Sequence, residues 1–328
     1  MKKLLLRIGL FLVILVIIIV GILTLCVMFP SVDNLIGTVT CSEGFDGYEE
    51  KTKTEAIEKT QNKNDGYTKL FVDDSVCASM FGRLQDKNSV YLFAGTNRAF
   101  LVAGQYVQIR EFLKTHDNVS EVYMFLSKGT WESTIDVQYG YQCFAVPIIS
   151  TNTFDDLENN TKQEMKDTYS GTLIQPWFVY IYNKSCVIRK LTLNLLNTYH
   201  EKVLKEDMSV NYVHEENKVS DVNQQYLDLI INMCENNNIA LHILHDPIAD
   251  TPDNRDDYDN EIKMINEISN DKNKKYLDEY LNSVLFYPED LFIDGVHFKG
   301  DDALNNQIIH DIQGKTNLLY DVVVTENN

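Results

Sequence analysis

Basic residues are scarce in this chain. It has 29 Lys and Arg against 48 Asp and Glu, which gives a formal net charge of −19 over 328 residues. Three of the basic residues lie within the first seven positions, so the remainder of the chain carries 26 basic and all 48 acidic side chains. Such a surface repels nucleic acid and anionic lipid and offers no basic track for phosphates. The charge therefore disfavours a nucleic-acid partner.

Paired cysteines are also missing. The chain has six cysteines, but no Cys-x-x-Cys pair and no closely spaced Cys/His cluster, which argues against a structural zinc site. Five of the six follow the apolar N-terminal segment, and an odd number leaves at least one thiol free or paired with another chain. The spacing of the cysteines permits a disulfide but does not identify which cysteines would form it. We expect neither a metal nor a cofactor.

Charge is absent between Ile8 and Phe29. This run is long enough to cross a hydrocarbon core of about 30 Å as a helix, and it exceeds the apolar core of roughly 7–15 residues in a cleaved signal peptide. No small-x-small cleavage site follows it. We expect residues 1–30 to form a basic tip and an uncleaved transmembrane signal anchor. Because Lys2, Lys3 and Arg7 precede the run, the positive-inside rule places the later domain outside the cytoplasm of a bacterial cell.

Beyond the anchor, residues 31–66 are polar with little apolar periodicity, which predicts a stalk. The following residues alternate short apolar runs with helical patterns. The expected strands are "KLFVDDS", "SVYLFAG", "EVYMFLS" and "IALHIL". This alternation predicts a mostly parallel sheet in a three-layer α/β/α sandwich over residues 67–328. Residues 131–220 are rich in Tyr and Asn, fit the rhythm least well, and are predicted to form an insertion or cap.

In an open parallel sheet, functional residues gather at the carboxyl ends of the strands. Ser75 follows the first expected strand, and Asp294 and His297 lie three positions apart in a loop at the end of the last expected strand, in "LFIDGVHF" before the last helix. A serine hydroxyl becomes a nucleophile when a histidine, oriented by a carboxylate, takes its proton. Taken singly, each residue is also explained by a cap or a turn. Their combination favours a Ser-His-Asp triad.

The segments "VDDSV" and "DGVHF" resemble the first and last sequence blocks of the SGNH (GDSL-like) hydrolases, over roughly residues 67–315. The resemblance implies a serine esterase in which Ser75 is the nucleophile, His297 the base and Asp294 its orienter. The anchor and the acidic domain are similar to those of bacterial surface members that add or remove acyl groups on cell-envelope glycans. An acylated cell-surface glycan is then the expected substrate, and a membrane-bound acyltransferase a partner if the reaction is a transfer.

Two positions depart from the family pattern. Asp73 replaces the glycine before Asp-Ser, and the third strand lacks the Gly-x-Asn-Asp block, whose asparagine lines the oxyanion hole. Gly95 matches the family's glycine block by position, and we expect Asn97 to replace the missing donor beside the N–H groups of Ser75 and Gly95. Losing one oxyanion donor costs about 2.7–4 kcal/mol of transition-state stabilisation. The alternative is a catalytically inactive glycan-binding or envelope-assembly protein with the same fold.

Other residues give weaker signals. His245 with Asp246 is a rival base at a strand end, whereas His242 is expected to be a satisfied sheet histidine. The segment "DNRDDYDN" at 253–260 lacks an EF-hand pattern, and a solvated acidic loop is favoured over a calcium site. Trp131, Trp177 and the tyrosines of residues 139–182 fit either a sugar-stacking platform or an ordinary core.

Overall fold

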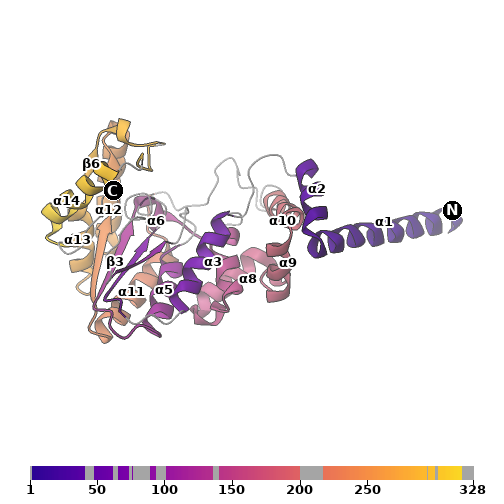
Figure 1. The fold of residues 1–328 in the computed structure, drawn as a ribbon, viewed down its shortest axis with the longest axis horizontal. Coiled ribbons are helices and arrows are strands. Elements are labelled where there is room, and N and C mark those ends of the chain that lie inside the picture. The colour runs from indigo at the N-terminus through magenta and orange to yellow at the C-terminus, as the bar shows by residue number, and fades with distance from the viewer. Residues whose placement is uncertain are drawn as a thin grey trace. The chain divides into compact units, whose positions relative to one another are not determined.

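Figure 1 shows the fold of the chain in a computed structural model. The structure describes residues 2–40, 48–61, 66–73, 76, 89–93, 101–135, 140–199, 217–293, 295–299 and 302–319. Helices predominate in these residues, and a small parallel sheet lies among them. The architecture is mixed α/β, as the alternation of strands and helices predicts.

The apolar N-terminal segment forms one long helix, α1 (Lys2–Met28). Its stretch Arg7–Met28 has 22 residues and a mean hydropathy of 3.5. At 1.5 Å per residue this stretch is about 33 Å long, enough to cross the hydrocarbon core of a bilayer. The predicted anchor is thus confirmed as a helix with the length and composition of a membrane span.

The chain forms two compact units. The smaller unit consists of Met1–Tyr48 and Tyr169–Ser209, and the larger one consists of Glu49–Thr168 and Val210–Asn328. The smaller unit contains α1, α2 (Pro30–Thr40), α9 (Pro176–Lys184) and α10 (Cys186–Tyr199). The larger unit contains the sheets.

The first four predicted strands form, and they make one parallel sheet in the order β2-β1-β3-β4. The last strand, expected before Asp294, is not part of this sheet, and among the described residues there Phe292 forms only an isolated bridge with Phe298. Their bounds are β1 (Lys69–Asp73), β2 (Ser89–Phe93), β3 (Glu121–Leu126) and β4 (Ala240–His245). The short apolar runs form strands because both faces of the sheet are covered; Leu70, Phe71 and Val72 are fully buried. In the register of the two central strands, Phe71 lies opposite Tyr123 and Val72 opposite Met124.

Helices pack on this sheet from several parts of the chain (Figure 1). α5 (Leu101–Leu113) contacts β1, α11 (Asp221–Asn236) contacts both α5 and β4, and α13 (Lys274–Ser283) contacts β4 and α14 (Asp302–Thr316). The remaining helices of the larger unit are α3 (Tyr48–Gln61), α6 (Lys128–Glu132), α7 (Val146–Ser150), α8 (Asn159–Leu173) and α12 (Pro252–Ile268), with one-turn segments at Tyr141–Ala145, Phe154–Asp156 and Glu289–Leu291. A four-stranded sheet among so many helices supports the mixed α/β class. It does not by itself establish the three-layer sandwich that the sequence predicts.

A second, two-stranded parallel sheet pairs β5 (Ile248–Ala249) with β6 (Phe286–Tyr287). The C-terminal segment follows β6. Its apolar residues pack with residues of β1, β3 and β4 in one buried cluster. We call this set the C-terminal core cluster. Its members are Phe71, Val76, Tyr123, Phe125, Leu244, Ala249, Tyr287, Phe292, Phe298, Ile308, Ile309, Ile312 and Leu319.

Two predicted regions have more structure than expected. The polar stretch 31–66, expected to be a stalk, contains α2 and α3, and α3 buries Ala56 and Ile57 in the larger unit. The expected insertion at 131–220 divides between the two units. α10 packs with the N-terminal helices and α9 packs with α10, while α6, α7 and most of α8 belong to the larger unit.

Cysteine pairing is absent from the part of the chain that the structure describes. Cys26, Cys143, Cys186 and Cys234 are all free thiols there. Burial raises the pKa of Cys234 to about 12, so this thiol stays protonated and unreactive at neutral pH.

Candidate active site at the carboxyl edge of the sheet

The order of the strands marks one point on the sheet as a candidate site. β1 and β3 are neighbours, and the chain continues from β1 to β2 on one side and from β3 to β4 on the other. In doubly wound sheets, the crevice at the carboxyl ends of two such strands is where ligands bind. Ser75 comes two positions after the end of β1, and Ser127 follows β3 directly.

Most of the predicted triad and oxyanion residues lie outside the described residues. These are Ser75, Gly95, Asn97 and Asp294. In sequence, Gly95 and Asn97 follow the end of β2 by two and four positions. His297 is the one predicted catalytic residue that the structure describes, and it is half-buried.

His297 lies in a tight turn closed by the backbone. The N–H of Ile293 donates to the carbonyl of His297 at 2.7 Å, and Phe292 and Phe298 form an antiparallel bridge. Gly295, within this turn, has a φ of +81°, a conformation that side chains with a Cβ rarely adopt. The described residues 295–297 thus lie in a turn whose backbone requires glycine at position 295.

Apolar residues that flank the two predicted catalytic segments share the C-terminal core cluster. Phe71 and Val76 lie on either side of Ser75 in sequence and are buried, with 0% and 4% of their surface exposed. Phe292 and Phe298 lie on either side of the Asp294–His297 segment and are equally buried. Their rings are 4.3 Å apart between centroids. The two segments, more than two hundred residues apart in sequence, therefore emerge from one packed core.

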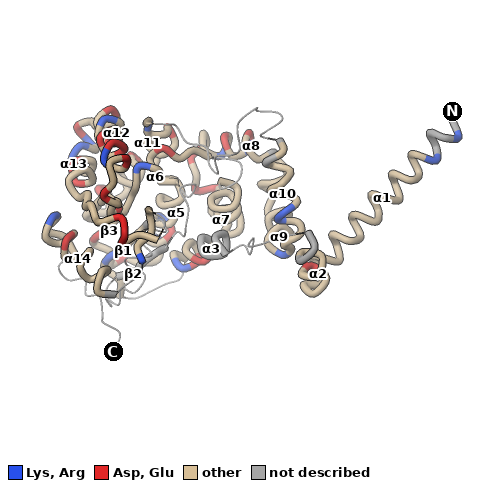
Figure 2. The backbone as a smooth tube through the Cα atoms, turned by 90° about the horizontal axis from the view of Figure 1, so that it is seen from above, with Lys and Arg blue, Asp and Glu red and all other residues tan. Residues whose placement is uncertain are grey.

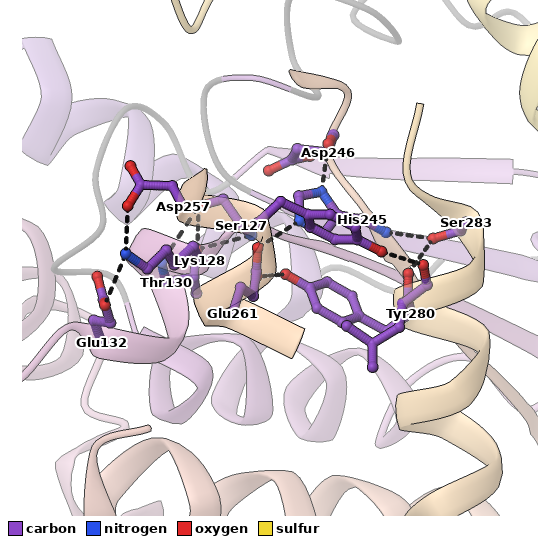
Figure 3. A network of polar contacts seen from close by, with 12 residues as sticks. Ser127, Lys128, Thr130, Glu132, His245, Asp246, Asp257, Glu261, Tyr280 and Ser283 are labelled. Carbon is purple, nitrogen blue, oxygen red and sulfur yellow. Dashed lines mark hydrogen bonds and ion pairs between the residues drawn. The ribbon is translucent and has the colours of Figure 1, made fainter. Parts of the chain in front are cut away.

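After β3, the place of the absent Gly-x-Asn-Asp block is taken by a capped helix. Ser127 caps α6: its hydroxyl accepts from the Thr130 N–H at 3.3 Å, and Thr130 reaches back to the Ser127 N–H. Lys128 next to it forms ion pairs with Asp257 at 2.9 Å and Glu132 at 3.4 Å (Figure 3). Burial alone would lower the pKa of Lys128, but these two carboxylates outweigh it and raise the pKa.

At the end of β4, His245 belongs to a buried polar network (Figure 3). Its Nε2 lies 2.9 Å from a carboxyl oxygen of Glu261 on α12, and its Nδ1 donates to the backbone carbonyl of Asp246 at 2.5 Å. The hydroxyl of Tyr280, from α13, donates to the other oxygen of Glu261, and the Tyr280 ring stacks on the imidazole. The side chains of His245 and Glu261 are only 2% and 1% exposed.

This geometry gives His245 a structural role. Both ring nitrogens are engaged, and the buried imidazole is closed to a bulky ester. The rival pair predicted from sequence joined His245 to Asp246, whereas the side-chain partner is Glu261, sixteen positions later. The sequence contains a sign that Glu261 is buried, because Glu261 shares one face of its helix with Met264 and Ile265, which are buried. A carboxylate in such an apolar stripe requires a buried partner.

The remaining sequence signals divide between core and surface. His242 lies 3.0 Å from Glu279 and stacks on Tyr123, so the expectation of a satisfied sheet histidine is confirmed. Trp131 is fully buried, whereas Trp177 is 59% exposed. The segment 253–260 is not a loop: it lies inside α12, which Thr251 caps and Pro252 begins. No group of three or more His, Cys, Asp or Glu side chains suited to a metal ion occurs within the described ranges.

Comparison of the chain with protein-family models, curated proteins and solved structures gives no match. The functional argument therefore rests on the residues and on the sheet that positions them.

Proposed function

We propose that this protein is a membrane-anchored, extracytoplasmic serine esterase or O-acyltransferase of the SGNH type, acting on acyl esters of cell-surface glycans. The observation that carries the proposal is the shared C-terminal core cluster. It holds residues on both sides of Ser75 and on both sides of Asp294 and His297. A triad can form from Ser75 and the Asp294–His297 segment only if the two parts of the chain lie close together. The packing of Phe71, Val76, Phe292 and Phe298 in one core supports this.

In the proposed reaction, the Ser75 hydroxyl attacks the acyl carbonyl carbon while His297 takes the hydroxyl proton. Asp294 holds the imidazole in the orientation needed for that transfer. His297 then returns the proton to the departing glycan oxygen, which leaves an acyl group on Ser75. Water or a second sugar hydroxyl removes the acyl group, which gives hydrolysis or transfer.

The oxyanion formed in each step needs donors that are in place before the reaction. We assign this role to the backbone N–H groups of Ser75 and Gly95 and to the side chain of Asn97. Ser127 and Thr130 use their hydroxyls on each other and on the backbone at the start of α6. Asn97 is therefore the better substitute for the family's missing asparagine.

The alternative is a catalytically inactive envelope protein that binds glycans or assists assembly. The capped helix α6 favours it, because this helix stands where the family has an oxyanion residue. An SGNH fold without that donor and without a substitute would retain binding and lose most of its rate.

A fluorophosphonate probe separates these two functions. The full chain in native membranes is incubated with the probe, and wild type is compared with Ser75→Ala and Ser127→Ala. Ser127 is the matched control because it follows the strand next to β1. We expect labelling of wild type and Ser127→Ala and none of Ser75→Ala.

The rate of 4-nitrophenyl acetate hydrolysis grades the result. His297→Ala should reduce kcat by about 10²–10⁴-fold, the usual contribution of a general base. Asn97→Ala should reduce kcat by about 10²–10³-fold if Asn97 is an oxyanion donor. Absence of labelling under conditions that label a known esterase would favour the inactive envelope protein.

A further inference from the structure

The longest acid-free segment after Phe29 departs from the acidic character of the chain. Between Asp167 and Glu201 there is no acidic residue, whereas Lys184, Arg189 and Lys190 are basic. The segment contains α9 and α10, which pack against each other with Ser185 between them. We call these two helices the α9–α10 pair. Figure 2 shows basic positions and no acidic ones on them, unlike α8 and α12.

The α9–α10 pair also exposes large apolar side chains. Trp177 and Tyr180 of α9 are 59% and 60% exposed, and Leu191 and Leu195 of α10 are 46% and 70% exposed. Among the described residues after Phe29, the other exposed large apolar side chains are Leu35, Ile293 and Val296. Basic residues interleaved with exposed Trp, Tyr and Leu are typical of helices that lie in a membrane interface.

Asp33 of α2, the helix that follows the anchor, forms hydrogen bonds with the α9–α10 pair. The Asp33 carboxylate accepts hydrogen bonds from the Ser185 hydroxyl at 2.5 Å and from the Cys186 N–H at 2.7 Å, at the start of α10. A Cβ on Gly37 of α2 would come within 2.6 Å of the Cys186 sulfur, so the two helices approach as closely as a glycine allows. The position of α10 relative to α1 and α2 is therefore defined by direct contacts.

α10 also lies beside the membrane-spanning stretch of α1. The two helices line a groove of about 360 Å³. Ile19, Ile22 and Leu23 form its α1 side, and Val187, Lys190, Leu191 and Asn194 form its α10 side. Ile19 and Leu23 precede Met28 by nine and five residues, which is roughly 8–14 Å along a helix. A bilayer crossed by α1 would therefore reach the α10 side of the groove.

We propose that the α9–α10 pair is a membrane-interface element that contacts phospholipid of the leaflet beside the carboxyl end of α1. Acyl chains contact Trp177, Leu191 and Leu195, and one acyl chain fills the groove between α10 and α1. The basic residues lie at the level of the lipid phosphates, where long basic side chains extend toward the headgroups. This inference rests on the anchor in the proposed function and is independent of any esterase activity.

The charge of the pair favours lipid over a glycan. A sugar-stacking platform would also use exposed Trp and Tyr, but a neutral sugar gives no reason for a stretch of more than thirty residues without a carboxylate. Acidic side chains would be repelled by lipid phosphates and would be costly to place next to acyl chains. Their absence from a stretch of this length fits a phospholipid surface.

The chain has only two tryptophans, Trp131 in the core of the larger unit and Trp177 on α9, and these provide the test. Full-length wild type and Trp177→Phe are reconstituted in vesicles of phosphatidylcholine and phosphatidylglycerol, with or without bromine on the acyl chains near the headgroups. The difference between the two proteins isolates the Trp177 emission. We expect brominated lipid to reduce it at least about twofold, since a helix at the headgroup and acyl boundary places its Trp within quenching distance.

The remaining emission of Trp177→Phe comes from buried Trp131 and should not change with bromination. A Trp177 emission that is insensitive to brominated lipid and fully quenched by aqueous acrylamide would overturn the proposal. Carbonate extraction of the same vesicles tests whether α1 is inserted in the bilayer. If the protein resists extraction but Trp177 is not quenched, the anchor is inserted and the α9–α10 pair does not contact lipid. Fluorophosphonate labelling of the same samples reports on the esterase separately.

Discussion

Single residues in this protein are explained best where a buried polar group meets its partner. Glu261 holds both His245 and Tyr280, which come from a strand and a different helix. Because the Asp246 carbonyl can only accept, Nδ1 of His245 is the donor to it, and Nε2 faces the Glu261 carboxyl group. Burial, followed by the charge of Glu261, raises the pKa of Tyr280 well above its usual value, which keeps the phenol a donor.

We expect Tyr280→Phe to lower the free energy of unfolding by about 1–3 kcal/mol, because one buried oxygen of Glu261 loses its donor. The matched control is Tyr258→Phe. The Tyr258 hydroxyl donates to the Leu281 carbonyl at 2.6 Å in a half-buried position, so its loss should cost about 0.5–1.5 kcal/mol. Urea unfolding followed by the emission of Trp131, whose ring meets Tyr280 edge-on at 5.6 Å, measures both. Equal losses in the two variants would show that the buried network adds no stability.

At this scale the sequence drew attention to His245 but suggested the wrong partner for it. His245 and Asp246 are adjacent, and adjacency suggested a pair. The actual partner, Glu261, comes from α12, and only the packing of α12 on the end of β4 brings its carboxylate to the imidazole. Tyr280 was not predicted, because nothing in "YLDEYL" distinguishes a network tyrosine from a core tyrosine.

Among the elements, the four strands of the main sheet were predictable because each is a short apolar run, and the runs of β1 and β3 are buried on both faces. α3 was missed because Ala56 and Ile57 are its only aliphatic residues and almost all the others are charged or polar, which leaves no apolar stripe to detect. The acidic segment 253–260 was predicted to be a loop, and it is helical. Its signals were the Thr251 cap, Pro252 at the first turn, and the buried Met264 and Ile265 further along.

The contact between α2 and α10 depends on the charge of Asp33. Burial would raise the pKa of Asp33, but hydrogen bonds from Ser185, Cys186 and Val187 outweigh it, and the pKa is lowered. A carboxylate with a lowered folded-state pKa contributes stability above its unfolded pKa of about 3.9, and this contribution is lost as the pH falls below that value through the folded pKa.

We therefore expect the docking of α10 to weaken as the pH falls below about 4. Asp33→Ala should lower stability by about 0.5–2 kcal/mol at neutral pH, as loss of a helix cap does, and should remove this pH dependence. Thermal unfolding of the reconstituted full chain, followed by the emission of Trp177, measures both effects. Asn34→Ala, at an exposed neighbouring position on α2, is the control and should behave as wild type. A pH dependence that persists in Asp33→Ala would assign it to another group.

Over the whole molecule, charge and hydropathy are distributed unevenly. Three basic residues stand at the start of α1, and the uncharged membrane-spanning stretch follows them. All the acidic residues of the chain come after α1 (Figure 2). Basic residues flanking a span remain in the cytoplasm. The acid-free stretch that contains the α9–α10 pair interrupts this acidic part.

We expect the chain after Phe29 to be accessible from outside the cell. Proteinase added to intact spheroplasts should remove a tag at the C-terminus and leave a tag at the N-terminus on a fragment of the size of α1. Immunoblotting of both tags measures this, with a cytoplasmic protein as the control for lysis. A protected C-terminal tag and a digested N-terminal tag would show the opposite orientation. Replacing Lys2, Lys3 and Arg7 by Glu should reduce the fraction in the expected orientation, because the basic bias sets it.

By itself, the sequence determined what depends on local composition: the apolar helix of membrane length, the four apolar strands, the acidic surface and the turn at Gly295. Each of these follows from residues close together in the chain. Only the tertiary structure decided which distant residues meet: Glu261 with His245, Asp33 with the start of α10, and the flanks of Ser75 with those of His297 in one core. Such contacts depend on how helices pack, because burial selects partners by their shape and position in space and not by their separation in sequence.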